Sequence, residues 1–474
     1  MSQCSVVLLI STYDLGRQPF GLASAAAALR AAGIDVVCAD LAKERLSEES
    51  VRRAAAIGFF LPMHTATRLA LPVIDRVRAL NPDARLVAYG LYAPLNAPML
   101  RERGASVIIG GEFEDALVAS IARSTLTTSR GSDGADRNSE LGTPASGFSV
   151  PRVHFLVPDR AGLPALTKYS TLQRGEERST AGYTEASRGC KHRCRHCPIV
   201  PVYDGRFRVV PVDVVMADVR GQVAAGARHI TFGDPDFFNG IGHAMAIASR
   251  FAQEFPGVSY DVTIKVEHLL QHADRLAPLR DTGCAFVTTA VESIDDHVLA
   301  LLDKGHTRAD FERVVEITRE LPLTLAPTFV AFTPWTTVEG YCDLLRAIDR
   351  LGLAENVSPI QLAIRLLVTH GSRLLELSDI RAVIRDFNPR SLNYPWAHPD
   401  PRVDELQKQV EARVGGNLSA PRQELFDRIW ALAHDAAGLR AERHTRHSPA
   451  QPIPHLSEPW YCCAEPTSEQ VALI

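Results

Sequence analysis

The residues with the clearest chemical signature are three cysteines in the string SRGCKHRCRHCP. Cys190, Cys194 and Cys197 are separated by three and two residues. Three thiolates at this spacing can bind three irons of a [4Fe-4S] cluster and leave the fourth iron open to a small molecule. A structural zinc site is the alternative, but zinc normally takes four protein ligands, and no fourth cysteine or suitably spaced Cys-His partner follows nearby. The spacing therefore predicts a cluster that does chemistry.

This loop resembles the signature of the radical S-adenosylmethionine (radical SAM) superfamily, in which an aromatic or imidazole residue usually precedes the third cysteine, here His196. The resemblance implies that S-adenosylmethionine chelates the open iron and is cleaved by an electron from the cluster to release a carbon radical. The protein then supplies orientation and protection from water. A small-molecule substrate and an electron donor such as flavodoxin or ferredoxin are the implied partners.

Composition limits the other classes of function. The chain has 474 residues, 46% of them hydrophobic, and a formal net charge of −4. Its basic residues are dispersed, which indicates neither a nucleic-acid partner nor a membrane surface. No membrane span or signal peptide is expected, so we predict a cytoplasmic protein. Its nine cysteines are then better explained as ligands, nucleophiles or buried residues than as disulfides.

Short apolar strands alternate with helices in the first part of the chain, which predicts an α/β fold with a parallel sheet covered on both faces. The expected strands are 6–10, 35–38, 56–61, 85–89 and 106–109. With the closing Gly110-Gly111-Glu112 run, this segment resembles the cobalamin-binding, Rossmann-like domain that precedes many radical SAM enzymes. The Asp-x-His-x-x-Gly motif that supplies a cobalt ligand elsewhere is missing. Cobalamin is therefore a possible cofactor whose cobalt no protein side chain ligates. His64 either contacts the bound cobalamin or is a polar loop residue.

Composition and pattern divide the rest of the chain. Residues 123–150 are rich in small polar residues and are expected to be a flexible linker. The predicted divisions are a cobalamin-binding-like domain at 1–122, this linker, an interdomain lead-in at 151–180, a radical SAM partial barrel at 181–380 and a C-terminal extension at 381–474.

Strand–helix units resume after the cysteine loop. Strands are expected at 229–232, 259–265, 285–290, 324–332 and 359–367, and helices include 266–282 and 308–320. With the strand leading into Cys190 they make six units. We therefore expect a partial (β/α)6 barrel whose active site lies at the carboxyl ends of the strands.

Polar side chains follow these strands. Asp234 and Asp236 occupy the position at which the radical SAM enzymes that this chain resembles bind the methionine amino group, and a carboxylate suits that role. An Asp-Pro turn with a helix cap is the alternative interpretation. Glu292 and Ser293 resemble the block that lies against the nucleoside or methionine part of the cofactor in radical SAM enzymes. Lys265 and Arg365 end the third and sixth strands, and each either clamps a carboxylate or is a solvated charge.

The end of the chain carries a pair of adjacent cysteines, Cys462 and Cys463, followed by Ala-Glu-Pro. This string resembles the tail of radical SAM enzymes with a Cys-Cys-Ala-Glu-Pro terminus, some of which carry selenocysteine at the second position. Adjacent thiolates favour a soft, thiophilic centre. We predict that both cysteines act on the substrate or an intermediate. A redox pair, ligands for a second metal and idle thiols are the alternatives.

Together these features predict a radical SAM enzyme that modifies a small substrate, forming a carbon–heteroatom bond to sulfur, selenium or an arsenic-like atom. A cobalamin-dependent radical methyltransferase is the alternative enzyme. A non-catalytic iron–sulfur or metalloid sensor is the alternative from another class.

Overall fold

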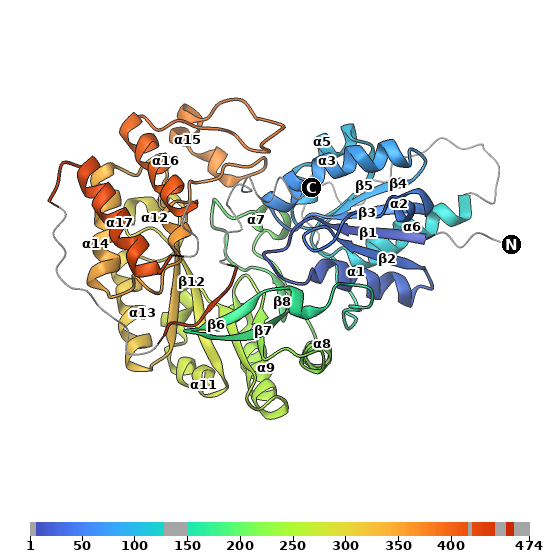
Figure 1. Ribbon diagram of the computed structural model, residues 1–474, viewed down its shortest axis with the longest axis horizontal. Helices are drawn as coiled ribbons and strands as arrows, with labels where there is room; N and C mark the ends of the chain where they lie inside the picture. The colour runs from blue at the N-terminus through green and yellow to red at the C-terminus, as the bar shows by residue number, and fades with distance from the viewer. Residues whose placement is uncertain (1–5, 128–149, 416–419, 441–451, 459–474) are drawn as a thin grey trace.

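The computed structural model describes residues 6–127, 150–415, 420–440 and 452–458. Two large sheets organise these residues, and each is covered by helices (Figure 1); a third sheet has only two strands. The first sheet is wholly parallel, with strand order β2-β1-β3-β4-β5. Its strands are β1 (Val6–Ser11), β2 (Val36–Asp40), β3 (Ala54–Phe60), β4 (Arg85–Tyr89) and β5 (Ala105–Ile109). The predicted N-terminal parallel sheet is therefore present.

Helices pack on both faces of this sheet because successive strand residues point in opposite directions. Val7 and Leu9 of β1 belong to the hydrophobic cluster that contains α1 and α6, whereas Leu8 and Ile10 belong to the cluster that contains α3, α4 and α5. The helices are α1 (Phe20–Ala31), α2 (Glu48–Arg53), α3 (His64–Leu80), α4 (Tyr92–Leu95), α5 (Ala97–Glu102) and α6 (Glu114–Thr127). Helix α6 thus extends into the interval expected to be a linker, whose residues 128–149 lie outside the described part.

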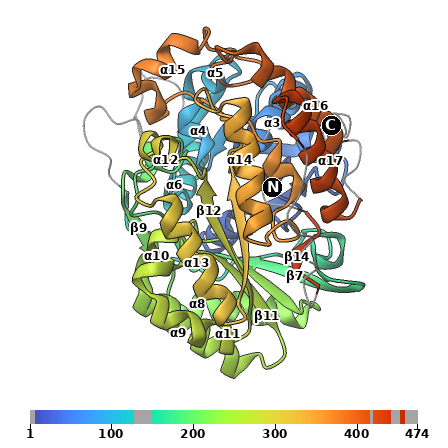
Figure 2. The same cartoon turned by 90° about the vertical axis from the view of Figure 1, so that its left-hand side faces the viewer.

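The second sheet is a curled half-barrel with strand order β13-β12-β11-β10-β7-β6-β14. Five of its strands are mutually parallel: β7 (Glu177–Thr184), β10 (His229–Phe232), β11 (Ser259–Thr263), β12 (Cys284–Glu292) and β13 (Thr324–Phe329). Antiparallel strands β6 (Thr171–Arg174) and β14 (His455–Leu456) extend the edge beside β7. The C-terminal segment therefore returns to the sheet near its first strand (Figure 2).

Helices cover the outer face of the half-barrel (Figure 2). Along β12, Val287 and Val291 join the hydrophobic core beneath the helices, whereas Phe286, Thr288 and Glu292 face the interior. The helices are α8 (Val212–Ala224), α9 (Ile241–Glu254), α10 (Val266–Gln271), α11 (Leu276–Asp281), α12 (Asp296–Leu301), α13 (Arg308–Glu320) and α14 (Val338–Arg350). This alternation leaves the inner face of the sheet to line a site.

Two predicted elements differ from the structure, and prolines explain both. The helix expected over 266–282 is divided into α10 and α11, because Pro278 has no N–H and its ring would clash with a preceding carbonyl in a continuous helix. The strand expected over 359–367 begins instead as a 3-10 helix at Pro359–Leu362, and a single bridge pairs Phe332 with Arg365. The sixth strand of the barrel is therefore reduced to that bridge.

The C-terminal extension packs onto the half-barrel. It contains α15 (Ser378–Val383), α16 (Pro401–Gly415) and α17 (Arg422–Ala436). Val403 and Phe426 belong to the same buried cluster as α14, so the extension shares the barrel's core. Within the described residues, no helix is both long enough and apolar enough to span a bilayer.

Candidate active site

A cavity of about 400 Å³ lies at the inner face of the half-barrel, where the N-terminal domain meets it. Three parts of the chain line this central cavity. The carboxyl ends of the half-barrel strands contribute residues such as Thr263 and Glu292, and the N-terminal domain contributes residues such as Asp14 and Tyr92. The C-terminal segment contributes Pro454, His455, Leu456 and Glu458. One cavity is therefore shared by both domains and by the segment that leads to the tail.

Cys190, Cys194 and Cys197 all line the central cavity. They follow β8 (Ser187–Gly189), which pairs with β9 (Phe207–Val209) after the short helix α7 (Val200–Tyr203). Gly189 has a φ of +77°, and a Cβ there would lie 2.4 Å from the Tyr203 ring. Only glycine therefore lets the chain turn into the loop at this point.

The three thiols fit an iron–sulfur cluster. They belong to one loop, face one cavity and form no disulfide. Burial raises the pKa of the free Cys190 thiol to about 12. A metal bound to this sulfur would stabilise the thiolate against that effect, as cluster ligation does.

Asp234 holds the backbone that leads to the cysteine loop. One carboxylate oxygen accepts a hydrogen bond from the Ala186 N–H (2.9 Å) and the other from the Ser187 hydroxyl (2.5 Å). Burial raises the pKa of Asp234 to about 7, although these hydrogen bonds oppose the shift. Both oxygens are thus engaged with the chain itself, at the wall of the cavity.

Asp236 lies beside the cysteine loop. Its Oδ1 accepts a hydrogen bond from the Phe238 N–H (3.1 Å) and caps the 3-10 helix Phe237–Gly240. Its Oδ2 lies 2.6 Å from Nδ1 of His268 and 3.5 Å from Nε2 of His192. The structure therefore gives Asp236 two imidazole neighbours.

Glu292 forms a buried charge cluster with two cavity residues. Its Oε1 lies 3.1 Å from Nε2 of His196 and 3.3 Å from Nζ of Lys304. Burial raises the pKa of Glu292, but Lys304 and His196 outweigh that effect and lower the pKa to about 2. Glu292 also adopts a φ of +69°, which is uncommon for a residue with a side chain. An ionised carboxylate is therefore fixed beside the residue that precedes Cys197.

The remaining predicted site residues have different surroundings. Lys265 lines the cavity with its Nζ 3.1 Å from Nδ1 of His192. Ser293 caps the following turn by accepting from the Asp295 N–H and is not among the cavity-lining residues described. Arg365 is directed toward the C-terminal extension, where it pairs with Asp404 (2.7 Å) and lies over the Trp396 ring. Cys462 and Cys463 lie outside the described residues.

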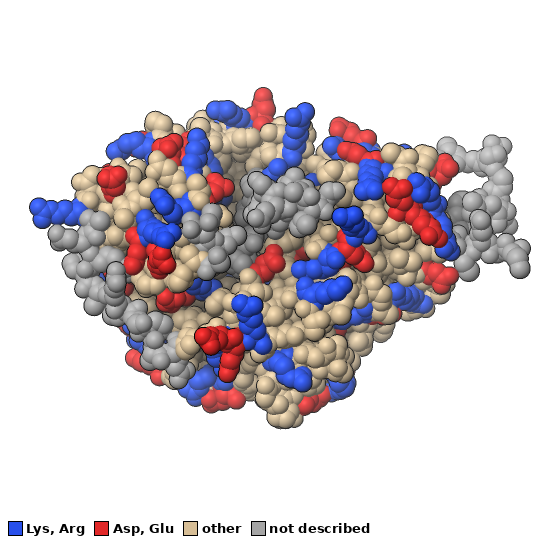
Figure 3. All heavy atoms as spheres, viewed as in Figure 1, with Lys and Arg blue, Asp and Glu red and all other residues tan. Residues whose placement is uncertain are grey.

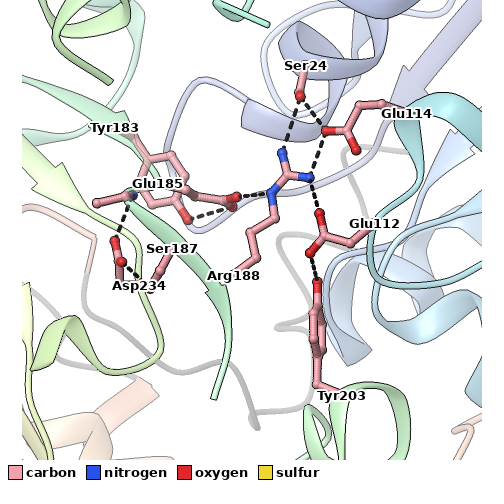
Figure 4. Close-up of polar contacts among 10 residues, drawn as sticks. Ser24, Glu112, Glu114, Tyr183, Glu185, Ser187, Arg188, Tyr203 and Asp234 are labelled. Carbon is pink, nitrogen blue, oxygen red and sulfur yellow. Dashed lines mark hydrogen bonds and ion pairs between the residues drawn. The ribbon is translucent and has the colours of Figure 1, made fainter. Parts of the chain in front are cut away.

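A buried arginine before the cysteine loop joins the two domains, and the sequence did not single it out. Arg188 contacts Glu185 of its own domain and Glu112 and Glu114 of the N-terminal domain, at 2.7, 3.3 and 2.7 Å (Figure 4). It also donates a hydrogen bond to the Ser24 hydroxyl (3.2 Å). We call Arg188 and these three glutamates the Arg188 cluster. It sets the position of the cysteine loop against the N-terminal domain.

Asp14, another residue that the sequence did not single out, makes stability depend on pH. Burial raises its pKa from 3.8 to about 7, although Arg17 opposes the shift. The pKa of Asp14 is higher in the folded chain than in the unfolded chain. The stability that protonated Asp14 contributes at low pH is therefore lost as pH rises toward about 7. Asp14→Asn should therefore gain about 2 kcal/mol relative to the parent between pH 5.5 and 8, measured by urea unfolding of the cluster-free chain. Asp83→Asn, at an exposed carboxyl, is the control, and an equal pH response in both variants would contradict the assignment.

Comparison with known proteins agrees with the geometry. Residues 184–336 match the family model of the radical SAM superfamily. A tRNA-2-methylthio-N(6)-dimethylallyladenosine synthase from Methylococcus capsulatus is 25% identical over 207 residues, 41% of this chain and 45% of that protein. The ribosomal protein uS12 methylthiotransferase RimO from Parabacteroides distasonis is 25% identical over 178 residues, 35% of this chain and 40% of that protein. The chain therefore matches less than half the length of these curated relatives.

Solved structures share the fold over more of the chain. The cobalamin-dependent S-adenosylmethionine radical enzyme OxsB, with aqua-cobalamin bound, superposes with a TM-score of 0.69 at 14% identity, covering 91% of this chain and 71% of OxsB. The radical S-adenosylmethionine methyltransferase TsrM from Kitasatospora setae, with cobalamin and a [4Fe-4S] cluster bound, gives 0.59 at 17% identity, covering 92% and 89%.

The domain match, the half-barrel and the cysteine loop together define the class of the central domain: residues 184–336 form a radical SAM domain. The N-terminal five-stranded domain belongs to the part of the fold that is shared with the cobalamin-bound structures of OxsB and TsrM. Radical SAM enzymes use a [4Fe-4S] cluster and S-adenosylmethionine, as the sequence predicted.

Proposed function

We propose that this enzyme cleaves S-adenosylmethionine and forms a carbon–heteroatom bond on a small substrate in the central cavity, with the tail cysteines acting on the substrate or an intermediate. The observation that carries the proposal is the shared lining of that cavity. Cys190, Cys194 and Cys197 contribute to it, and so does the C-terminal segment through Glu458. The names of the two curated relatives support the proposal, because both refer to a methylthio group.

The C-terminal segment holds the start of the tail at the cavity. Strand β14 pairs with β6, and the Tyr13 hydroxyl donates a hydrogen bond to Glu458 (2.6 Å). Cys462 is the fourth residue after Glu458, and a fully extended chain spans at most about 14 Å over that length. The cavity is therefore within the reach that the chain length allows for the two cysteines.

The proposed roles of the cavity residues follow from their contacts. Cys190, Cys194 and Cys197 would hold the cluster, which when bound supplies the electron that cleaves S-adenosylmethionine. Lys265, which lines the cavity, would bind a carboxylate, and Glu292, in contact with His196, would orient that ring beside the third cysteine. The apolar walls of the cavity exclude water from the radical.

The substrate class and the partners are part of the same proposal. Lys and Arg are interspersed with Asp and Glu on the face shown in Figure 3, without a continuous basic stripe. This distribution favours a small substrate over a nucleic acid. Because one relative is named for a tRNA modification, the absence of a nucleic-acid partner stays a prediction. Flavodoxin or ferredoxin is the proposed electron donor.

A cobalamin-dependent methyltransferase is the second candidate, because the N-terminal domain opens onto the same cavity. Asp14 and Met63 line it from loops that follow strands of the first sheet, and Tyr92 lines it from the start of α4. His64 is not among the lining residues described; it is fully buried, and its Nε2 lies 2.7 Å from the Ser391 carbonyl oxygen. Cobalamin would therefore bind without His64 as a ligand, and corrinoid absorbance in the reconstituted protein would favour this candidate.

The first experiment is to incubate the reduced, cluster-loaded protein with S-adenosylmethionine and identify the nucleoside released. Release of 5′-deoxyadenosine or 5′-methylthioadenosine supports the proposal and reports which carbon–sulfur bond breaks. No cleavage would instead favour a non-catalytic sensor.

The tail prediction uses arsenite as a probe of the two thiols. Cys462→Ser and Cys463→Ser should each leave nucleoside release unchanged but weaken arsenite binding to the cluster-loaded protein by about 100-fold, because a chelating pair becomes a single ligand. Arsenic bound per chain provides the measurement, and Cys38→Ser, in β2, is the control. If both tail variants bind arsenite as tightly as the parent, the cysteines do not act as a pair.

A further inference from the structure

Three potential metal ligands converge beside the cysteine loop without involving its thiols. His192 belongs to that loop, Asp236 follows β10, and His268 lies in α10. Oδ2 of Asp236 is 2.6 Å from Nδ1 of His268 and 3.5 Å from Nε2 of His192. All three atoms lie within 4.8 Å of one another. Three separate elements thus direct one donor atom each toward a common point.

These donor atoms are buried and have no partners outside their own group. Asp236 and His268 are each 1% exposed, and the His192 side chain is 14% exposed. Beyond their contacts with one another, none of the three atoms has a hydrogen-bond partner among the described residues. Buried polar atoms are usually paired, so three that face one point without an outside partner are explained by a bound ion. Oδ1 of Asp236 already caps Phe238, which leaves Oδ2 for this point.

The spacing and the surroundings suit a divalent ion. Bonds of about 2.0–2.2 Å from nitrogen and oxygen to a metal place neighbouring donors about 3 Å apart, and the two measured separations lie on either side of that value. Metal-bound histidines usually donate the other ring N–H to a carboxylate. Oε2 of Glu267 lies 3.6 Å from Nδ1 of His192 and 3.4 Å from Nζ of Lys265. Nζ of Lys265 also lies 3.1 Å from Nδ1 of His192. When Nε2 of His192 binds a metal and Nδ1 carries the proton, Glu267 can accept from Nδ1–H, and Lys265 then turns from the ring to that carboxylate.

We propose that His192, Asp236 and His268 bind a divalent first-row metal ion, Zn²⁺ or Fe²⁺, separate from the iron–sulfur cluster. Two histidines and one carboxylate leave coordination positions open to water or to a ligand from the cavity. The ion would fasten the cysteine loop to the end of β10 and to α10. Asp236 is then a metal ligand rather than a contact of the methionine amino group.

Zinc content and coordination test this proposal in the full-length, cluster-loaded chain without a purification tag. After incubation with Zn²⁺ and removal of the excess, we expect about one zinc per chain. Its X-ray absorption should show nitrogen and oxygen ligands only when it is measured on the Cys462→Ser/Cys463→Ser chain, because the cluster occupies the loop thiolates and the tail thiols are then absent. His268→Ala should lose this zinc while keeping the cluster iron. His272→Ala is the matched control, since its ring lies only 6.0 Å from that of His268, and it should retain the zinc.

Three results would overturn the proposal: no retained zinc, sulfur in its coordination shell, or unchanged zinc in His268→Ala. Should His268→Ala fail to fold, Asp236→Asn is the second variant, because its amide oxygen preserves the cap on Phe238 and its shape is nearly the same. Zinc retained by a folded Asp236→Asn chain would equally exclude the site.

Discussion

Replacing Arg188 by methionine is expected to lower the free energy of unfolding by about 3–5 kcal/mol, because it leaves buried carboxylates without their cation. Arg188 is 7% exposed, and its guanidinium is the shared partner of Glu112, Glu114 and Glu185. Methionine keeps much of the apolar stem, so the charge is the main group lost. Urea unfolding of the chain under anaerobic conditions measures the effect.

The control is Arg52→Met. Arg52 forms an exposed pair with Glu48 one helical turn away, and such pairs contribute about 0.5 kcal/mol or less. Adding Glu114→Gln to Arg188→Met should recover part of the loss, because it removes one of the unpaired carboxylates. If Arg188→Met costs no more than Arg52→Met, the Arg188 cluster does not hold the domains together.

The strands were predictable because their signals are local. The bounds of β4, β10 and α13 agree with the ranges expected from apolar runs and their flanking breakers. The sixth barrel strand was not predictable in this way. Pro359 begins a 3-10 helix, and the chain that follows makes only one bridge, to Phe332 just after β13. Arg365 consequently faces Asp404 rather than the cavity. Long-range pairing decided that side chain's direction, and no local pattern reports such pairing.

The candidate site was predictable where strand ends converge. Asp234, Asp236, Lys265 and Glu292 line one cavity with the three cysteines, since the carboxyl ends of parallel strands meet at one edge of the sheet. The contacts around these residues and around the cysteine loop were harder to predict. Arg188 meets Glu112 across 76 residues of sequence, and His268 reaches Asp236 from a helix of the next unit. The contact between Lys304 and Glu292 spans only twelve residues of sequence, and Lys304 lies in the polar turn after α12. It was therefore easier to predict than the two contacts above.

The largest effect on activity is expected from Cys194→Ala. Cys194 is 7% exposed and lines the cavity between the other two cysteines of the loop. Two remaining thiolates cannot hold a cluster that needs three protein ligands, so iron should fall from about four per chain to less than one after anaerobic reconstitution. Release of nucleoside from S-adenosylmethionine should then drop to the level seen without protein, because the source of the electron is gone.

Cys284→Ala separates this effect from the loss of a buried thiol. Cys284, at the start of β12, is 6% exposed and therefore as buried as Cys194, but it is not among the cavity-lining residues described. Its replacement should cost stability without removing iron, because a buried cysteine away from a metal behaves as a small apolar side chain. Iron content, absorbance near 400 nm and nucleoside release, measured on both variants at equal protein concentration, distinguish the two roles. A Cys194→Ala chain that kept its iron and still cleaved S-adenosylmethionine would require a different cluster ligand, and the cysteine loop would lose the role on which the proposed reaction depends.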